Sequence, residues 1–119
     1  MKRFRFGWYG DGGLGERMIQ TILAGRKTAT SCPDYDPDNA DLKPDEEFQV
    51  LDKHGTVRGQ LIVTLVEVRS FGSYDEALAE KEGVSLPELK EKMNFAHGRQ
   101  IRADEDMRVV HFRLKAASR

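Results

Sequence analysis

The segment after Gly25 places a basic residue, Lys27, three positions before a threonine, Thr30, with Arg26 alongside. A threonine hydroxyl becomes a useful nucleophile only when another group removes its proton. A lysine can do so only as the neutral amine, which requires desolvation or a nearby cation to lower its pKa from about 10.4. Arg26 could supply that cation, although adjacent side chains on a strand point in opposite directions. Lys27 and Thr30 also face opposite sides of a regular strand, so their cooperation requires the chain to bend just after Gly25.

The run from Ile22 to Ser31 resembles the signature of the ASCH domain, a small barrel related to the PUA fold. The family pattern has a glycine, any residue, a lysine, a polar or acidic residue three positions later, and then an arginine two positions on. Gly25, Lys27 and Thr30 fill the first three places, whereas Cys32 stands where the arginine is expected. Residues 23–28 with Thr30, together with the later segment 79–90, resemble one branch of this family, the bacterial N4-acetylcytidine amidohydrolases.

This resemblance implies a catalytic trio of Lys27, Thr30 and Glu82 in a hydrolase that cleaves a non-peptide amide bond. The substrate would be N4-acetylcytidine or a related acylated nucleoside. Glu82 would protonate the leaving nitrogen or orient Lys27, and the two groups would titrate as a coupled pair. The residues expected to bind the substrate are Arg26, Thr28, Trp8 and Tyr35.

Simpler interpretations of the trio remain open. Lys27 could be a solvated lysine near a helix C-terminus, where a cation is favourable. Thr30 could be a strand residue selected for β propensity, and Glu82 a solvated carboxylate at a helix end. Two other functions also remain open, a non-catalytic RNA-binding module and an ASCH-type ribonuclease. The missing arginine at position 32 weakens both, because one phosphate partner is lost.

The other reactive residue types indicate no second site. Cys32 has no histidine near it in the sequence and is expected to be a bystander thiol. The three histidines lack the spacing of metal ligands, so we expect neither a metal nor another cofactor. Residues 7–15 are rich in glycine but lack the strand and the Gly-Lys-Ser/Thr ending of a phosphate-binding loop. The resemblance implies a nucleoside or a modified RNA as the partner, and it implies no protein partner.

Composition points to an ordinary globular chain. The 119 residues are expected to form a single domain over 1–119, with a net charge of −1. Eight acidic residues and one basic residue lie between residues 31 and 52, a run typical of a solvated loop. One cysteine excludes a disulfide framework, and no apolar run is long enough to span a membrane. Since no secretory signal is recognisable at the N-terminus, we expect a cytoplasmic location.

Hydrophobic periodicity predicts the elements that hold the trio. An apolar stripe beginning at Leu14 predicts a helix that ends at Gly25, and a short strand should follow over residues 26–31. Further strands are expected at residues 48–51, 56–71 and 108–114. Capping patterns at Ser73 and Ser85 predict the starts of two later helices.

The strand over 56–71 has apolar residues on both faces, with Leu61, Val63 and Leu65 on one of them, which predicts a central, buried position. Strands joined by hairpins and irregular loops favour a mixed or antiparallel sheet over a doubly wound one. Together with the resemblance, this predicts an α+β fold. We expect a small PUA-like β-barrel of about five to six mostly antiparallel strands with two to three flanking helices.

Overall fold

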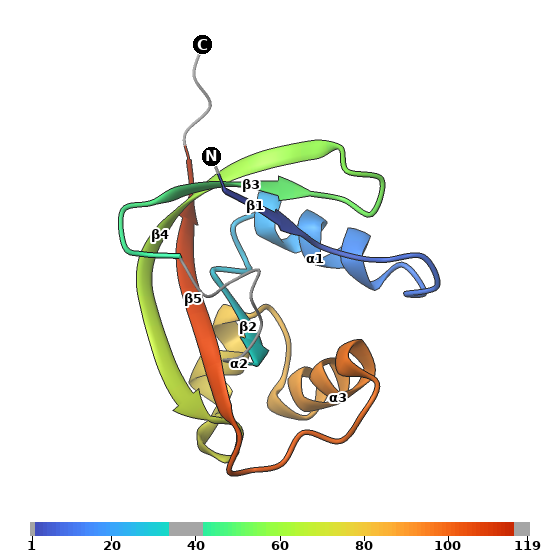
Figure 1. Cartoon of the computed structure of the whole chain (residues 1–119), viewed down its shortest axis with the longest axis vertical. Helices are drawn as coiled ribbons and strands as arrows, with labels where there is room; N and C mark the ends of the chain where they lie inside the picture. Colours follow the sequence, from blue (N-terminus) through green and yellow to red (C-terminus); the bar gives the residue numbers. More distant parts are fainter. Residues whose placement is uncertain (1, 34–41, 116–119) are drawn as a thin grey trace.

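The computed structural model describes residues 2–33 and 42–115, which contain five strands and three α-helices (Figure 1). Their order along the chain is β1 (Lys2–Arg5), α1 (Leu14–Leu23), β2 (Ala29–Pro33), β3 (Glu47–Leu51), β4 (Val57–Ser70), a 3-10 turn η1 (Phe71–Ser73), α2 (Glu76–Lys81), α3 (Leu86–His97) and β5 (Asp106–Leu114). Within these residues no helix combines the length and the apolar character that crossing a membrane would require.

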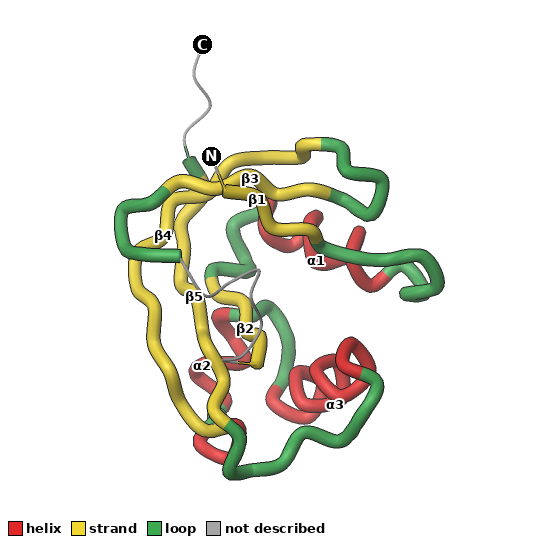
Figure 2. The backbone as a smooth tube through the Cα atoms, in the orientation of Figure 1, coloured by secondary structure: helices red, strands yellow, loops and turns green. Residues whose placement is uncertain are grey.

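The strands form one sheet in the order β1-β3-β4-β5-β2. β1 runs parallel to β3, and the other three pairings are antiparallel. The long strands β4 and β5 bend along their length, so the sheet curls into a half-barrel with α1 and α3 on its inner side (Figures 1 and 2). This is the α+β, mostly antiparallel PUA-like barrel that was predicted. The sequence analysis missed β1, because three of its four residues are charged and it becomes a strand by pairing with β3.

β4 is the central strand, as predicted, but its faces differ from the prediction. The register with β5 shifts between Val63, which pairs with Phe112, and Leu65, which pairs with His111. This bulge at Thr64 moves the later residues to the opposite face, so Leu65 is 48% exposed while Leu61 and Val63 are buried. The prediction that all three share a buried face is therefore wrong from Leu65 onward.

Two apolar clusters pack against opposite faces of β5. Val110 and Phe112 belong to the cluster that also buries Ile19 and Ile22 of α1. Met107 and Val109, on the other face, belong to the cluster that buries Leu78 of α2, Leu89 of α3 and their neighbours. Because β2 is the edge strand beside β5, its successive residues also face these two clusters alternately.

The helix starts are confirmed at two places and corrected at one. α1 begins at Leu14, and Gly25 follows its end with φ +78°, a conformation that suits glycine. Ser85 caps α3 as predicted, accepting from the N–H of Glu88. Ser73 does not cap α2, because its hydroxyl donates to the Ser70 carbonyl at 2.6 Å within the 3-10 turn. Asp75 is the cap instead, and its carboxylate accepts from the N–H of Leu78 at 2.9 Å.

Candidate active site

The turn after α1 directs Lys27 into the interior. The N–H groups of Arg26 and Lys27 both donate to the Thr21 carbonyl, at 3.0 and 3.2 Å, so the chain reverses sharply beyond Gly25. β2 begins only at Ala29, and Lys27 is therefore not subject to strand alternation. Its side chain is buried, with the residue 2% exposed, and Nζ donates to the Ala29 carbonyl at 2.8 Å. The bend required for convergence with β2 is present.

Glu82 reaches the same place from the end of α2. It is the C-terminal cap of that helix, and its own N–H donates to the carbonyls of Leu78 and Ala79. The next residue, Gly83, packs so closely on α1 that a Cβ there would lie 2.8 Å from Cγ2 of Thr21. Glu82 is 3% exposed, and its Oε1 lies 3.5 Å from Nζ of Lys27. Two segments that are distant in the sequence thus form one buried ion pair.

The second carboxylate oxygen of Glu82 binds a residue that the sequence analysis did not identify. Ser31 Oγ donates to Glu82 Oε2 at 2.5 Å. No pattern in the sequence marks Ser31, because its contact depends on α2 packing against β2. Strand alternation alone would show only that Ser31 and Thr30 point to different sides.

Thr30 is also buried, at 6% exposure, and it pairs with Val110 across the sheet. The side-chain hydrogen bonds that Lys27, Ser31 and Glu82 make among the described residues do not include it. Thr30 is therefore a neighbour of the Lys27–Glu82–Ser31 network and stands outside it.

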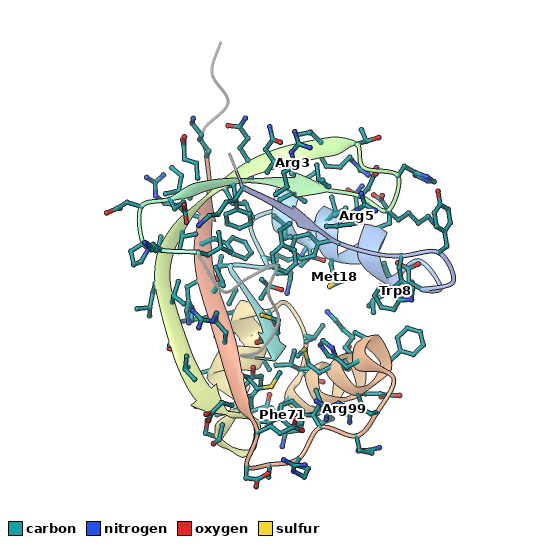
Figure 3. The ribbon with its side chains drawn as sticks, in the orientation of Figure 1. Arg3, Arg5, Trp8, Met18, Phe71 and Arg99 are labelled. Carbon is teal, nitrogen blue, oxygen red and sulfur yellow. The ribbon has the colours of Figure 1, made fainter. Side chains whose placement is uncertain are left out.

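One cavity of about 260 Å³, between α1 and α3, is lined by the side chains of Lys27, Thr30, Ser31 and Glu82. Figure 3 shows Met18 and Trp8, which also line it, on the upper side of this space, opposite α3. A second cavity of about 370 Å³ is lined by some of the same residues. The residues common to both cavities are Leu14, Met18, Lys27, Glu82 and Lys92.

Burial determines the electrostatics of the two cavity lysines. It lowers the pKa of Lys27 below its ordinary value, while the Glu82 carboxylate acts in the opposite direction. Desolvation, one of the two causes considered from the sequence, therefore outweighs the effect of the Glu82 carboxylate. Burial also lowers the pKa of Lys92, on α3, to about 8, with the positive charge of Lys27 as a further cause. Sequence reasoning did not single out Lys92, since only the placement of α3 brings it to the cavity.

No family model and no curated protein sequence matches this chain. An ASCH domain from Lactobacillus crispatus is similar in structure, with a TM-score of 0.75 and 20% identity over 95% of this chain and 79% of that chain. The chain has the ASCH fold. Protein EF3133 from Enterococcus faecalis, of the family model DUF984, gives a TM-score of 0.72 and 21% identity over 97% of this chain and 76% of that one. Hypothetical protein PH0355 gives 0.60 and 16%, covering 97% of this chain and all of that one.

Of the four residues expected from the sequence to bind substrate, Trp8 lines the cavity. Trp8 lies at the rim of the cavity, 37% exposed, with its ring 5.8 Å from that of Phe95 on α3. Arg26 and Thr28 do not line this cavity. They line a separate surface depression beside α2, where the N–H of Thr28 donates to the Lys81 carbonyl. Tyr35 lies outside the described residues.

Hydrogen bonds within the glycine-rich segment, residues 7–15, position Trp8 at the rim of the cavity. Asp11, which is buried, accepts from the N–H groups of Trp8, Gly13 and Gly15 at 3.2, 2.9 and 2.9 Å. These bonds, led by the one from Gly15, lower the pKa of its carboxyl. Three N–H donors of this segment are therefore occupied by a side chain of the protein. Cys32 is buried and lies close to the Arg108 carbonyl, with Sγ 3.8 Å from the oxygen.

The described residues contain no group of three or more histidine, cysteine and acidic side chains placed to hold a metal ion. The chemistry that this site offers is that of a hydroxyl, a carboxylate and an ammonium group in a cavity with a mainly apolar lining. Such a set can transfer an acyl group, because it combines a nucleophile, a proton acceptor and a cation that can stabilise an oxyanion.

Proposed function

We propose that this protein belongs to the ASCH family and is an amidohydrolase that removes the acetyl group from N4-acetylcytidine or a related acylated nucleoside. The observation that carries the proposal is the convergence of Lys27, Thr30 and Glu82, from two segments of the chain, on one cavity. The same residue types occupy the matching positions of the N4-acetylcytidine amidohydrolase motif.

The buried ion pair accounts for two of the requirements of amide hydrolysis. A carboxylate is needed to accept the proton of the attacking hydroxyl and to return it to the departing amine. A cation is needed where negative charge develops on the carbonyl oxygen. Glu82 and Lys27, 3.5 Å apart and both buried, supply these groups where water screens them little. Of the hydroxyls on β2, the resemblance gives Thr30 the role of nucleophile.

Trp8 and Phe95 suit a flat aromatic substrate at the cavity mouth. Their rings approach each other from the glycine-rich segment and from α3, and both are partly exposed. A nucleobase can stack on such rings without a specific hydrogen-bond pattern. We propose that Trp8 contacts the base, whereas Arg26 and Thr28 line the separate depression beside α2.

The test is incubation of the purified protein with N4-acetylcytidine and separation of the products by chromatography. Cytidine and acetate should appear in equal amounts. The variants Lys27→Ala and Glu82→Ala should each lose most of the rate, and a comparable loss in Thr30→Ala is what the role implied by the resemblance requires. Lys90→Gln is the control variant. Lys90 lies on α3 like the cavity residue Lys92, but it does not line the cavity, and its Nζ lies 5.8 Å from the ring centre of Phe71.

A wild-type protein that releases no cytidine would refute the proposal. If it instead bound RNA with an affinity whose logarithm falls linearly with the logarithm of salt concentration, a binding module would replace the enzyme. Cleavage of the RNA in the same experiment would indicate the ribonuclease.

A further inference from the structure

We infer that Ser31, rather than its neighbour Thr30, is the nucleophile of this site and that Glu82 is its general base. The inference rests on the proposed function for its substrate, but its geometric argument depends only on the cavity residues. Nothing in the resemblance assigns a role to Ser31.

The two hydroxyls belong to different faces of β2. Ser31 pairs with Val109, which packs in the cluster that contains the α2 residues Leu78 and Ala79. Thr30 pairs with Val110, which packs on the α1 side. Glu82 follows α2 directly, so strand alternation directs the Ser31 hydroxyl, and not that of Thr30, toward the carboxylate.

The hydrogen bond between Ser31 and Glu82 has the direction that general-base catalysis requires. A carboxylate can only accept, so the Ser31 O–H donates to Oε2, and the distance of 2.5 Å is that of a short charge-assisted bond. Ser31 is only partly buried and lines the cavity, so substrate can reach its oxygen. The Ser31 hydroxyl thus already donates to its proton acceptor before substrate arrives.

Lys27 fixes the orientation of this pair. Its Nζ contacts the other carboxylate oxygen, Oε1, at 3.5 Å and donates to the Ala29 carbonyl at 2.8 Å. An ammonium group has three N–H donors, of which the described residues use two. The third is available to the oxygen of a bound acyl group, where it stabilises the negative charge of the tetrahedral intermediate.

The reaction then balances without any further reactant except water. Ser31 Oγ attacks the acetyl carbonyl carbon while its proton passes to Glu82 Oε2. Collapse of the intermediate breaks the C–N bond, and the proton on Glu82 goes to the departing N4, which leaves as the amino group of cytidine. Water attacks the acetyl–Ser31 ester and gives one proton to Glu82, which returns it to Ser31 Oγ as the C–O bond breaks; acetic acid leaves and ionises to acetate by losing the second proton of the water to solvent.

The experiment traps the acyl group and locates it. The protein is mixed with N4-acetylcytidine, quenched in acid and digested, and the peptide containing both hydroxyls is fragmented in the mass spectrometer. We expect an acetyl group on Ser31 in the wild-type protein and in Thr30→Ala, and none in Ser31→Ala. Ser31→Ala should also lose at least about 10³-fold in kcat while remaining folded, as its circular dichroism spectrum would show.

An acetyl group on Thr30 would overturn the inference, even if Ser31→Ala were slow, because Ser31 would then only position Glu82. Unimpaired turnover by Ser31→Ala would overturn it as well. Lys90→Gln, prepared in parallel, controls for the effect of mutation as such.

A second probe separates this inference from the proposed function. A fluorophosphonate reacts with an activated serine when Oγ displaces fluoride at phosphorus and the base takes the proton. If the protein does not hydrolyse N4-acetylcytidine, the substrate proposal fails. Labelling of Ser31 that disappears in Glu82→Gln would still support the Ser31–Glu82 pair, and absence of labelling in the wild-type protein would refute it.

Discussion

Replacing Glu82 by Gln should lower the free energy of unfolding, because the buried Lys27 then lacks its carboxylate partner. The side chains of Lys27 and Glu82 are 1% and 3% exposed, and the ion pair contact is 3.5 Å. Removing one partner of such a pair leaves an uncompensated buried charge, which costs about 3–5 kcal/mol. A small domain has about 5–15 kcal/mol of unfolding free energy, so Glu82→Gln should be folded but visibly weakened.

The double variant shows whether the cost arises from the pair. Lys27→Met alone should cost about as much as Glu82→Gln, because each leaves the partner charge buried. The two changes together should cost about 2–3 kcal/mol less than their sum, since residues in contact are not additive. Urea unfolding followed by circular dichroism measures all three variants, with Glu80→Gln, an exposed change on the same helix, as the control.

The cost of Glu82→Gln should also depend on pH. Without the carboxylate, burial alone acts on Lys27, so its folded-state pKa falls further below the unfolded value of about 10.4. Between these two pKa values the unfolded chain binds the extra proton, and stability rises with pH by up to about 1.4 kcal/mol per unit. Burial also lowers the pKa of Lys27 in the wild-type protein, so the deficit of Glu82→Gln should shrink with rising pH between the folded-state pKa values of variant and wild type, and stay constant from there up to the unfolded value. Strict additivity, or a loss within about 1 kcal/mol of the control, would refute the reasoning.

Three other features of the structure can be tested with matched pairs of measurements. Lys92, with a pKa of about 8, should be acylated at half its maximal rate near pH 8; a profile like that of a model lysine peptide, with a midpoint near 10.4, would contradict its burial at the cavity. Gly15→Ala should cost about 3 kcal/mol in urea unfolding, because the new Cβ would lie 2.2 Å from Cα of Gly7. Gly12→Ala, with open space around it but φ +66°, should cost only about 1 kcal/mol, and equal losses would exclude the steric explanation. Asp75→Ala should cost about 1 kcal/mol as the loss of a helix cap, whereas Ser73→Ala should cost less; the reverse order would restore the cap predicted from the sequence.

Local signals in the sequence were sufficient for much of the fold. The stripe from Leu14, the capping pattern at Ser85 and the apolar run through Leu61 depend on residues a few positions apart, and the corresponding elements are present. The predictions that were wrong concern a helix cap for which two residues compete and the pairing of strands that are distant in the sequence. Ser73 loses the cap to Asp75 because its hydroxyl has a nearer acceptor, and the bulge at Thr64 is settled by the register with β5.

The residues of the candidate site likewise fall into those that the sequence identified and those that only the structure revealed. Lys27, Thr30 and Glu82 were identified from motif resemblance, since their residue types and order are properties of the chain itself. Ser31 and Lys92 carry no such mark, and the separation of Arg26 and Thr28 from the cavity could not be read from their adjacency to Lys27. These facts depend on how α2 and α3 pack against β2, and packing joins groups that are fifty or more residues apart. Sequence thus determined which reactive groups the protein possesses, whereas the tertiary structure decided which hydroxyl meets the carboxylate, because hydrogen bonding and burial act over a few ångströms in space and not along the chain.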